Sequence, residues 1–259
     1  DAKAKERDRS LMTREKFAIH YEGKLGDFVG RVFNYQRGDR HFGPANFPEL
    51  FPSGGSGPSD LRIPEGWELV GGADTGTFYT GLLVAFSPSG DAFVVDEFPN
   101  YRYVAGLPER DEGITIPEWS TAVVGRVSGL GGSMAFWADA NSQFKRELIN
   151  YGITLLPNKA TREQRTEIAR EYFQHLRIYI APWLEILPFE LENASWPEMA
   201  TAAGRYARVK DRDHTLDCLE HVLCKRPMGA GLGPEKAPGR WSDQFRPKSG
   251  IGNVHLGVN

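Results

Sequence analysis

Cysteine is scarce in this sequence of 259 residues, in which only Cys218 and Cys224 occur. The two thiols are six positions apart within one predicted helix, so they do not face one another. Their spacing fits neither a metal-binding nor a redox motif. We interpret both as packing thiols, the usual role of a free cysteine, and the cysteines therefore indicate no metal or redox chemistry.

Long apolar runs and an excess of basic residues are also absent. No apolar run approaches the roughly 20 residues needed to span a bilayer, and residues 1–9 are charged, unlike a secretory signal. We therefore expect a cytoplasmic protein without a membrane partner. The formal net charge of -3 gives no global electrostatic footprint for nucleic acid. The first residue is not methionine, so we expect it to lie inside a longer protein.

What the sequence does contain is enough apolar material for a substantial core, since 40% of its residues are hydrophobic and 12% aromatic. We predict three parts. Residues 1–60 form a lead-in with a helix at 13–21, a linker and a flexible loop rich in Gly, Ser and Pro at 51–59. Residues 61–226 form the folded core, and residues 227–259 a basic, flexible tail. From position 225 onward six Lys or Arg residues stand against two acids.

The core has the pattern of a mixed α/β protein. Short aromatic or β-branched runs at 67–73, 77–87 and 92–98, with a turn at 87–91, predict a three-stranded antiparallel meander. Helices and strands then alternate, and a capping box begins the helix at 161–175. The remaining expected elements are helices at 117–127, 141–151 and 213–225, strands at 133–138, 153–156 and 177–180, and a helical or turn segment at 186–193. The last helix carries an apolar stripe at Leu216, Leu219 and Leu223.

Acidic residues stand at the ends of three of these elements. Asp74 and Asp139 end strands, and Asp213 begins the last helix, with Asp217 one turn later. Each position alone is typical of a turn or a helix cap. Together they suit hard divalent cations, which take one or two carboxylates each and complete their shell with water and phosphate oxygens. Two such ions can activate water and stabilise the leaving oxygen in phosphodiester cleavage.

Several short motifs resemble the C-terminal nuclease domain of the large terminase subunit of tailed double-stranded DNA bacteriophages. The resemblance covers about residues 12–225. It is carried by GADTG at 72–76, ADAN at 138–141 followed by FKREL at 144–148, and DHTLDCL at 213–219. The segments FAIHYEGK at 17–24, GRVF at 30–33, RIYI at 177–180 and FELENASW at 189–196 agree in order and spacing.

The resemblance implies an RNase H-like fold, with a mixed central β-sheet flanked by helices. It also implies a Mg²⁺- or Mn²⁺-dependent endonuclease that cuts concatemeric viral DNA by two-metal hydrolysis in the host cell cytoplasm. Double-stranded DNA would be the substrate, and the portal protein and small terminase subunit would be partners of the full-length protein. No G-x-x-x-x-G-K-[ST] loop is present, so ATP-driven translocation is not expected of this chain.

The resemblance assigns the metal-binding and catalytic positions to Asp74, Asp139 and the start of the last helix. There the third ligand stays open between Asp213, His214 and Asp217; we favour Asp213 and then Asp217. His214 could instead shuttle a proton.

The remaining polar candidates have structural alternatives. Lys145 and Arg146 follow the second acid and could contact DNA phosphates, although a solvent-exposed helix face is the simpler interpretation. We expect four other acids to be structural: Asp96, Glu97, Glu190 and Glu192.

Two other functions fit the same sequence. The domain could guide DNA and dock on the portal through its basic tail. It could also be a junction-resolving enzyme or a ribonuclease on the same fold, with a preference for branched DNA or RNA hybrids.

Overall fold

The structure is a computed structural model that describes residues 31–38, 40–76, 78–139, 144–196 and 213–226. The chain divides into two compact units, Asp1–Met228 and Gly229–Asn259. The second unit lies wholly outside the described residues, as does the helix predicted at 13–21. The division at residues 60 and 226 therefore stays a prediction.

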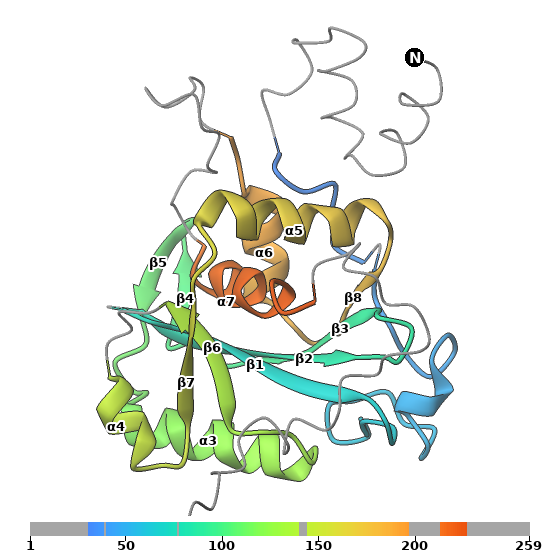
Figure 1. Cartoon of the computed structure of the whole chain (residues 1–259), viewed down its shortest axis with the longest axis horizontal. Helices are drawn as coiled ribbons and strands as arrows, with labels where there is room; N and C mark the ends of the chain where they lie inside the picture. Colours follow the sequence, from blue (N-terminus) through green and yellow to red (C-terminus); the bar gives the residue numbers. More distant parts are fainter. Residues whose placement is uncertain (1–30, 39, 77, 140–143, 197–212, 227–259) are drawn as a thin grey trace, which may run out of the picture. The chain divides into compact units, whose positions relative to one another are not determined.

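A six-stranded mixed sheet in the order β7-β6-β1-β2-β3-β8 forms the centre of the first unit (Figure 1). The first three strands form an antiparallel meander, and β6, β7 and β8 join it in parallel. Both the meander and the RNase H-like fold class predicted from the sequence are confirmed. The strand bounds are β1 (Glu68–Thr75), β2 (Tyr79–Phe86), β3 (Ala92–Glu97), β6 (Ala135–Asp139), β7 (Thr154–Asn158) and β8 (Ile178–Ile180).

Helices cover both faces of the sheet, with α5, α6 and α7 on one side and α3 and α4 on the other (Figure 1). The predicted capping box at the start of α5 is confirmed: Thr161 and Gln164 exchange hydrogen bonds between side chain and backbone. Within the helix predicted at 141–151, residues 141–143 lie outside the described ranges, and the described part is helical only as α4, which begins after the left-handed Phe144 and ends before Asn150. The helix bounds are η1 (Pro48–Leu50), α3 (Ile116–Gly129), α4 (Lys145–Ile149), α5 (Arg162–Gln174), α6 (Ile186–Asn193) and α7 (His214–Leu223).

A second, two-stranded sheet was not predicted from the sequence. It is a hairpin of β4 (Tyr101–Val104) and β5 (Leu107–Arg110). Its turn places Ala105 at φ 48° and Gly106 at φ 80°. Such turns usually carry Asn-Gly or Asp-Gly, because only a few residue types adopt positive φ without strain. An alanine in that place hides the hairpin from sequence inspection.

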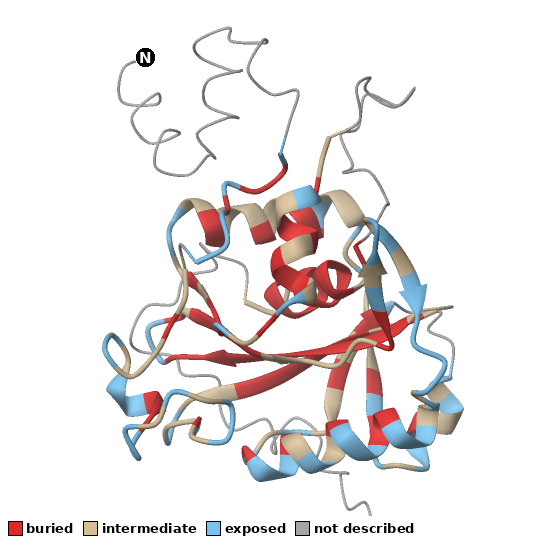
Figure 2. Cartoon of the chain, turned by 180° about the vertical axis from the view of Figure 1, so that it is seen from behind, coloured by how far each residue is buried: buried red, intermediate tan, exposed pale blue. Residues whose placement is uncertain are grey.

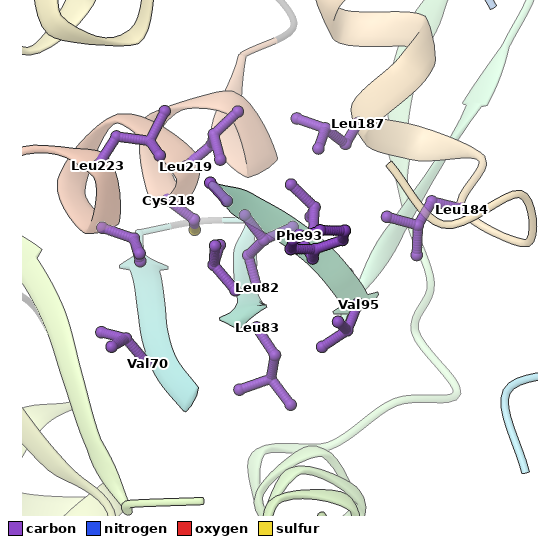
Figure 3. Close-up of a cluster of buried hydrophobic side chains, with 14 of the residues drawn as sticks. Val70, Leu82, Leu83, Phe93, Val95, Leu184, Leu187, Cys218, Leu219 and Leu223 are labelled. Atoms are coloured by element: carbon purple, nitrogen blue, oxygen red, sulfur yellow. The ribbon is translucent and has the colours of Figure 1, made fainter. Parts of the chain in front are cut away.

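Helix α7 lies at the centre of the first unit, in contact with β1, β2, β6, α5 and α6. The sequence predicted one apolar stripe, but residues 215–223 are all buried (Figure 2). Close approach of α7 to β1 depends on Gly72, because a Cβ atom there would lie 2.3 Å from the backbone oxygen of Cys218. Figure 3 shows Cys218 in one apolar cluster with Leu82 of the sheet and Leu187 of α6.

Residues preceding the sheet also contribute to this core. Phe33, Phe42 and Phe51 are almost fully buried, and Phe42 packs edge-on against Phe93 of β3 with ring centroids 5.5 Å apart. In the loop that follows, the Asp60 carboxylate accepts hydrogen bonds from the Ser53 hydroxyl and the Gly57 amide. None of the helices in the described ranges has the length and apolar character needed to cross a membrane.

Candidate functional site

Asp74 and Asp139 lie near the carboxyl ends of two neighbouring strands of the sheet, β1 and β6. Strands β1 and β6 are parallel neighbours, with Gly71 opposite Phe136 and Gly72 opposite Trp137. Each aspartate is two residues beyond the second pair, and neighbouring strands are about 4.8 Å apart. Both side chains contact residues of α7, so they are on the same face of the sheet.

Asp74 is paired with the first residue of α7. Its Oδ2 lies 2.9 Å from Nδ1 of His214, and the Asp74 side chain is 25% exposed. Burial lowers the pKa of His214, but the hydrogen bond and negative charge of Asp74 outweigh it, with help from Glu190 and Asp213, so the pKa is raised. The ring is thereby biased toward its charged form, as expected beside a carboxylate.

Asp139 is the more accessible of the two, with a side chain 61% exposed. Its Oδ1 lies 3.2 Å from Nη1 of Arg165 and 3.4 Å from Nε2 of His221. Arg165 comes from the first turn of α5 and is nearly buried, whereas His221 is two turns along α7 from His214. Two basic side chains from different helices therefore fix the orientation of this carboxylate.

The two other acids proposed from the sequence meet a different partner. Nη2 of Arg162 bonds to Asp213 and lies 3.0 and 3.1 Å from the two oxygens of Asp217. Both carboxylates are nearly buried, and a buried charge is costly unless it is paired in this way. Of the three candidates for the third ligand, the structure thus brings only His214 to Asp74, and holds Asp213 and Asp217 on an arginine.

Across the described ranges, no three His, Cys, Asp or Glu side chains are grouped as they would be around a metal ion. The carboxylate oxygens of Asp74 and Asp139 are nevertheless of the kind that a hard divalent cation prefers, and Asp139 is open to solvent. A third ligand from α7 would require Arg162 or Asp74 to release its partner.

Lys145 and Arg146 are at the start of α4, half-buried and exposed respectively. Helix α4 is in the layer with α3, on the other side of the sheet from α5 and α7 (Figure 1). The structure therefore does not bring these two cations to the face of the sheet on which Asp74 and Asp139 contact α7. A role in DNA contact stays a prediction.

The acids at the end of β3 and in α6 hold the fold together. Asp96 bonds Arg126 at 2.6 Å. The Glu97 carboxylate accepts hydrogen bonds from three backbone amides at the start of α6, those of Glu185, Ile186 and Leu187, at 2.7 to 2.9 Å. Burial raises the pKa of Glu97, although these donors favour its charged form.

Glu190, in α6, likewise binds backbone amides at the start of a helix, in this case α7. Its Oε2 accepts a hydrogen bond of 2.7 Å from the amide of Leu216 in the first turn of α7, and its Oε1 accepts from the hydroxyls of Tyr101 and Tyr103 at 2.6 and 2.8 Å. Burial raises the pKa of Glu190 to about 8. The Tyr101 hydroxyl in turn accepts from the amide of Thr215 at 3.2 Å.

Apart from His214, sequence inspection missed the basic residues that surround the acids, namely Arg162, Arg165 and His221. One signal was present: His214, Asp217 and His221 are three and four positions apart, which puts them on one side of a helix. Arg162 and Arg165 are likewise three apart in α5. Their pairing with α7 is a long-range contact that spacing along the chain does not reveal.

No family model and no curated protein matches the sequence, but solved structures do match the fold. The large terminase of thermophilic bacteriophage D6E has a TM-score of 0.62 at 14% identity, over 87% of this chain and 52% of that one. Its ADP complex gives 0.63 at 14% identity, over 88% and 53%. The P22 large terminase nuclease domain gives 0.54 at 12% identity, over 77% of this chain and 94% of that domain.

This chain spans about half the length of the D6E protein and nearly the whole of the P22 domain. At identities of 12–14% the likeness establishes the fold. The chain therefore has the fold seen in phage large terminases and in the isolated nuclease domain of the P22 terminase.

Proposed function

We propose that this chain is a metal-dependent endonuclease domain of a viral DNA-packaging terminase and that it hydrolyses double-stranded DNA. The observation that carries the proposal is that Asp74 and Asp139 stand near the carboxyl ends of two neighbouring parallel strands, β1 and β6. In α/β sheets, ligands bind outside the carboxyl ends of the parallel strands, and both aspartates are at such ends. The fold likeness to large terminases supports it.

Asp74 and Asp139 would hold Mg²⁺ or Mn²⁺, and two ions with DNA bound. Such ions polarise a phosphoryl oxygen and lower the pKa of bound water. His214 orients Asp74 through Oδ2, and Arg165 and His221 orient Asp139 through Oδ1. Fixed carboxylates reduce the reorganisation that cation and substrate binding would otherwise require.

The third ligand would come from the start of α7. Asp213, His214 and Asp217 all remain candidates, and each has a present partner to leave. The two acids would exchange the Arg162 guanidinium for a cation, whereas His214 would exchange the Asp74 carboxylate. Substituting each of the three separately, and measuring Mn²⁺ affinity, would identify the ligand.

The test is cleavage of supercoiled plasmid in Mg²⁺, Mn²⁺ or EDTA. We expect nicking and linear product with either metal and none with EDTA, and a loss of at least about 10³-fold in Asp74→Asn and Asp139→Asn. Asp91→Asn is the matched control, because Asp91 is at the opposite end of the sheet and pairs with Arg177. It should cut like the unaltered protein.

Thermal stabilisation by Mn²⁺ gives a second measurement that needs no DNA. A ligand that binds only the native state raises the free energy of unfolding, and this rise should be lost in Asp74→Asn and kept in Asp91→Asn. Unchanged plasmid cleavage in both Asp74→Asn and Asp139→Asn would overturn the assignment of these two residues. Absence of cutting by the unaltered chain with either metal would count against the nuclease activity itself.

A further inference from the structure

Among the residues that the structure describes, the one directly before α7 gives its first turn no side-chain cap. The first N–H groups of a helix have no partner within the helix, and Asp213, in the N-cap position, provides no side-chain hydrogen bond to them. Its carboxylate binds Arg162 instead. The donors of this turn must therefore be satisfied by other parts of the chain.

Two side chains from distant segments supply that cap. Glu190 of α6 accepts from the Leu216 amide, and Tyr101 of β4 accepts from the Thr215 amide. The Tyr101 hydroxyl also lies 2.8 Å from the Thr215 hydroxyl and donates to Glu190. All these groups are buried, where a hydrogen-bonded network is strongest and most restrictive in geometry.

Tyr101 also contacts the residue that pairs with Asp74. Its ring packs edge-on against His214, with centroids 5.5 Å apart, and Phe78 packs on the same imidazole at 5.2 Å. Tyr101 thus contacts the His214 ring and also accepts a hydrogen bond from the amide of the next residue, Thr215. Position of the helix end and position of the imidazole are set by one side chain.

We propose that Tyr101 and Glu190 are positioning residues of the site, which fix the first turn of α7 so that His214 meets Asp74. This inference rests on the proposed nuclease function. Neither residue is assigned contact with DNA or metal. Because a displacement of about 1 Å can cost about 100-fold in rate, loosening this turn would slow cleavage while leaving DNA binding largely intact.

The test compares single-hydroxyl deletions. Tyr101→Phe removes a hydroxyl that reaches both Glu190 and α7, whereas Tyr103→Phe removes one that reaches Glu190. Tyr172→Phe removes a buried hydroxyl that donates to the Arg226 backbone oxygen, beyond the other end of α7. It is therefore a control for the loss of a buried hydrogen bond as such.

We expect kcat for plasmid cleavage to fall about tenfold or more in Tyr101→Phe with KM for DNA unchanged, and to be kept in Tyr172→Phe at a similar loss of thermal stability. Tyr103→Phe should show a smaller loss of kcat. Glu190→Ala should lose more than Tyr101→Phe, and Glu190→Gln should recover part of it, because the amide oxygen can still accept from Leu216.

Hydrogen exchange of the Thr215 and Leu216 amides gives a measurement without metal or DNA. Exchange should be about tenfold faster in Tyr101→Phe and unchanged in Tyr172→Phe. Equal exchange and equal kcat in these two variants would overturn the proposal. If the unaltered chain cuts no DNA, the nuclease function fails, and the exchange comparison still decides whether Tyr101 holds the first turn of α7.

Discussion

Two pairs of helices in this protein are capped in opposite ways. Helices α3 and α5 begin with capping boxes built from residues three positions apart, Thr115 with Glu118 and Thr161 with Gln164. Helices α6 and α7 begin with Glu185 and Asp213, neither of which makes a side-chain cap bond. Their amides are satisfied by Glu97 and Glu190, which are far away in the sequence.

The difference teaches how the site is tied to the sheet. A capping box orders a helix by itself, whereas a remote cap orders one element relative to another. Glu97 at the end of β3 holds the start of α6, and Glu190 within α6 holds the start of α7. Two carboxylates in series, those of the half-buried Glu97 and the buried Glu190, thus connect the central sheet to His214.

The two kinds of cap also differ in electrostatics. Glu118 is exposed, and hydrogen bonds from the Thr115 hydroxyl and backbone amide lower its pKa. Burial raises the pKa of both remote glutamates, and that of Glu190 to about 8. A remote cap therefore couples helix position to pH, and a local cap in solvent does so far less.

The largest expected effect follows from this coupling. Glu190 titrates at about 8 in the native state against an ordinary 4.5, so the native state retains a proton that the unfolded chain releases between these values. The free energy of unfolding should therefore fall as pH rises through this window, by about 5 kcal/mol in all. Urea unfolding of the unaltered protein and Glu190→Gln between pH 5 and 8 measures it.

The Glu190→Gln variant should have a visibly flatter pH dependence, because its amide does not titrate. Thr161→Ala serves as the control from the locally capped pair and should keep the slope of the unaltered protein. Identical slopes for Glu190→Gln and the unaltered protein would show that titration of Glu190 does not make stability depend on pH.

Glu97→Ala is expected to destabilise the protein by about 3 kcal/mol, at about 1 kcal/mol for each amide left without a partner. Glu185→Ala changes the N-cap residue of the same helix and should alter stability by less than about 0.5 kcal/mol. Chemical denaturation of both variants measures the difference. Equal losses would show that α6 is capped locally after all.

The smallest effect is expected for the capping boxes. Thr161→Ala and Thr115→Ala should each cost about 1 kcal/mol, and plasmid cleavage should be unaffected in Thr115→Ala once folding is controlled. Stability and kcat measured together test this expectation. A cleavage defect in Thr115→Ala would show that α3, on the other face of the sheet, also positions the site.

The same contrast explains which elements were predictable from the sequence. The start of α5 and the turn between β2 and β3 carry their own signals, and both were predicted. The β4–β5 hairpin was not, because Ala105 occupies a positive-φ position that sequence rules reserve for Gly, Asn or Asp. Burial of α7 on all sides was also missed, since its polar residues are satisfied by α5: Thr166, for example, donates to Glu220.

The candidate site also has a part that could be predicted from the sequence and a part that could not. Asp74 and Asp139 were proposed from the sequence because each stands near the end of a strand, and the sheet order makes those two strands neighbours. The pairing of His214 with Asp74, and of Arg162 with Asp213 and Asp217, depends on how α5 and α7 pack. Packing of helices against each other leaves no signal at one position of a single sequence.

Gly72 sets the thickness of the layer between the sheet and α7. With hydrogen as its side chain, β1 and α7 touch backbone to backbone, and two residues farther along the same strand Asp74 meets the first residue of that helix. Even one added methyl group would act as a spacer there, forcing strand and helix apart. Gly72 touches neither Asp74 nor His214, but by keeping β1 close to α7 it determines how near the Asp74 carboxylate lies to the His214 imidazole.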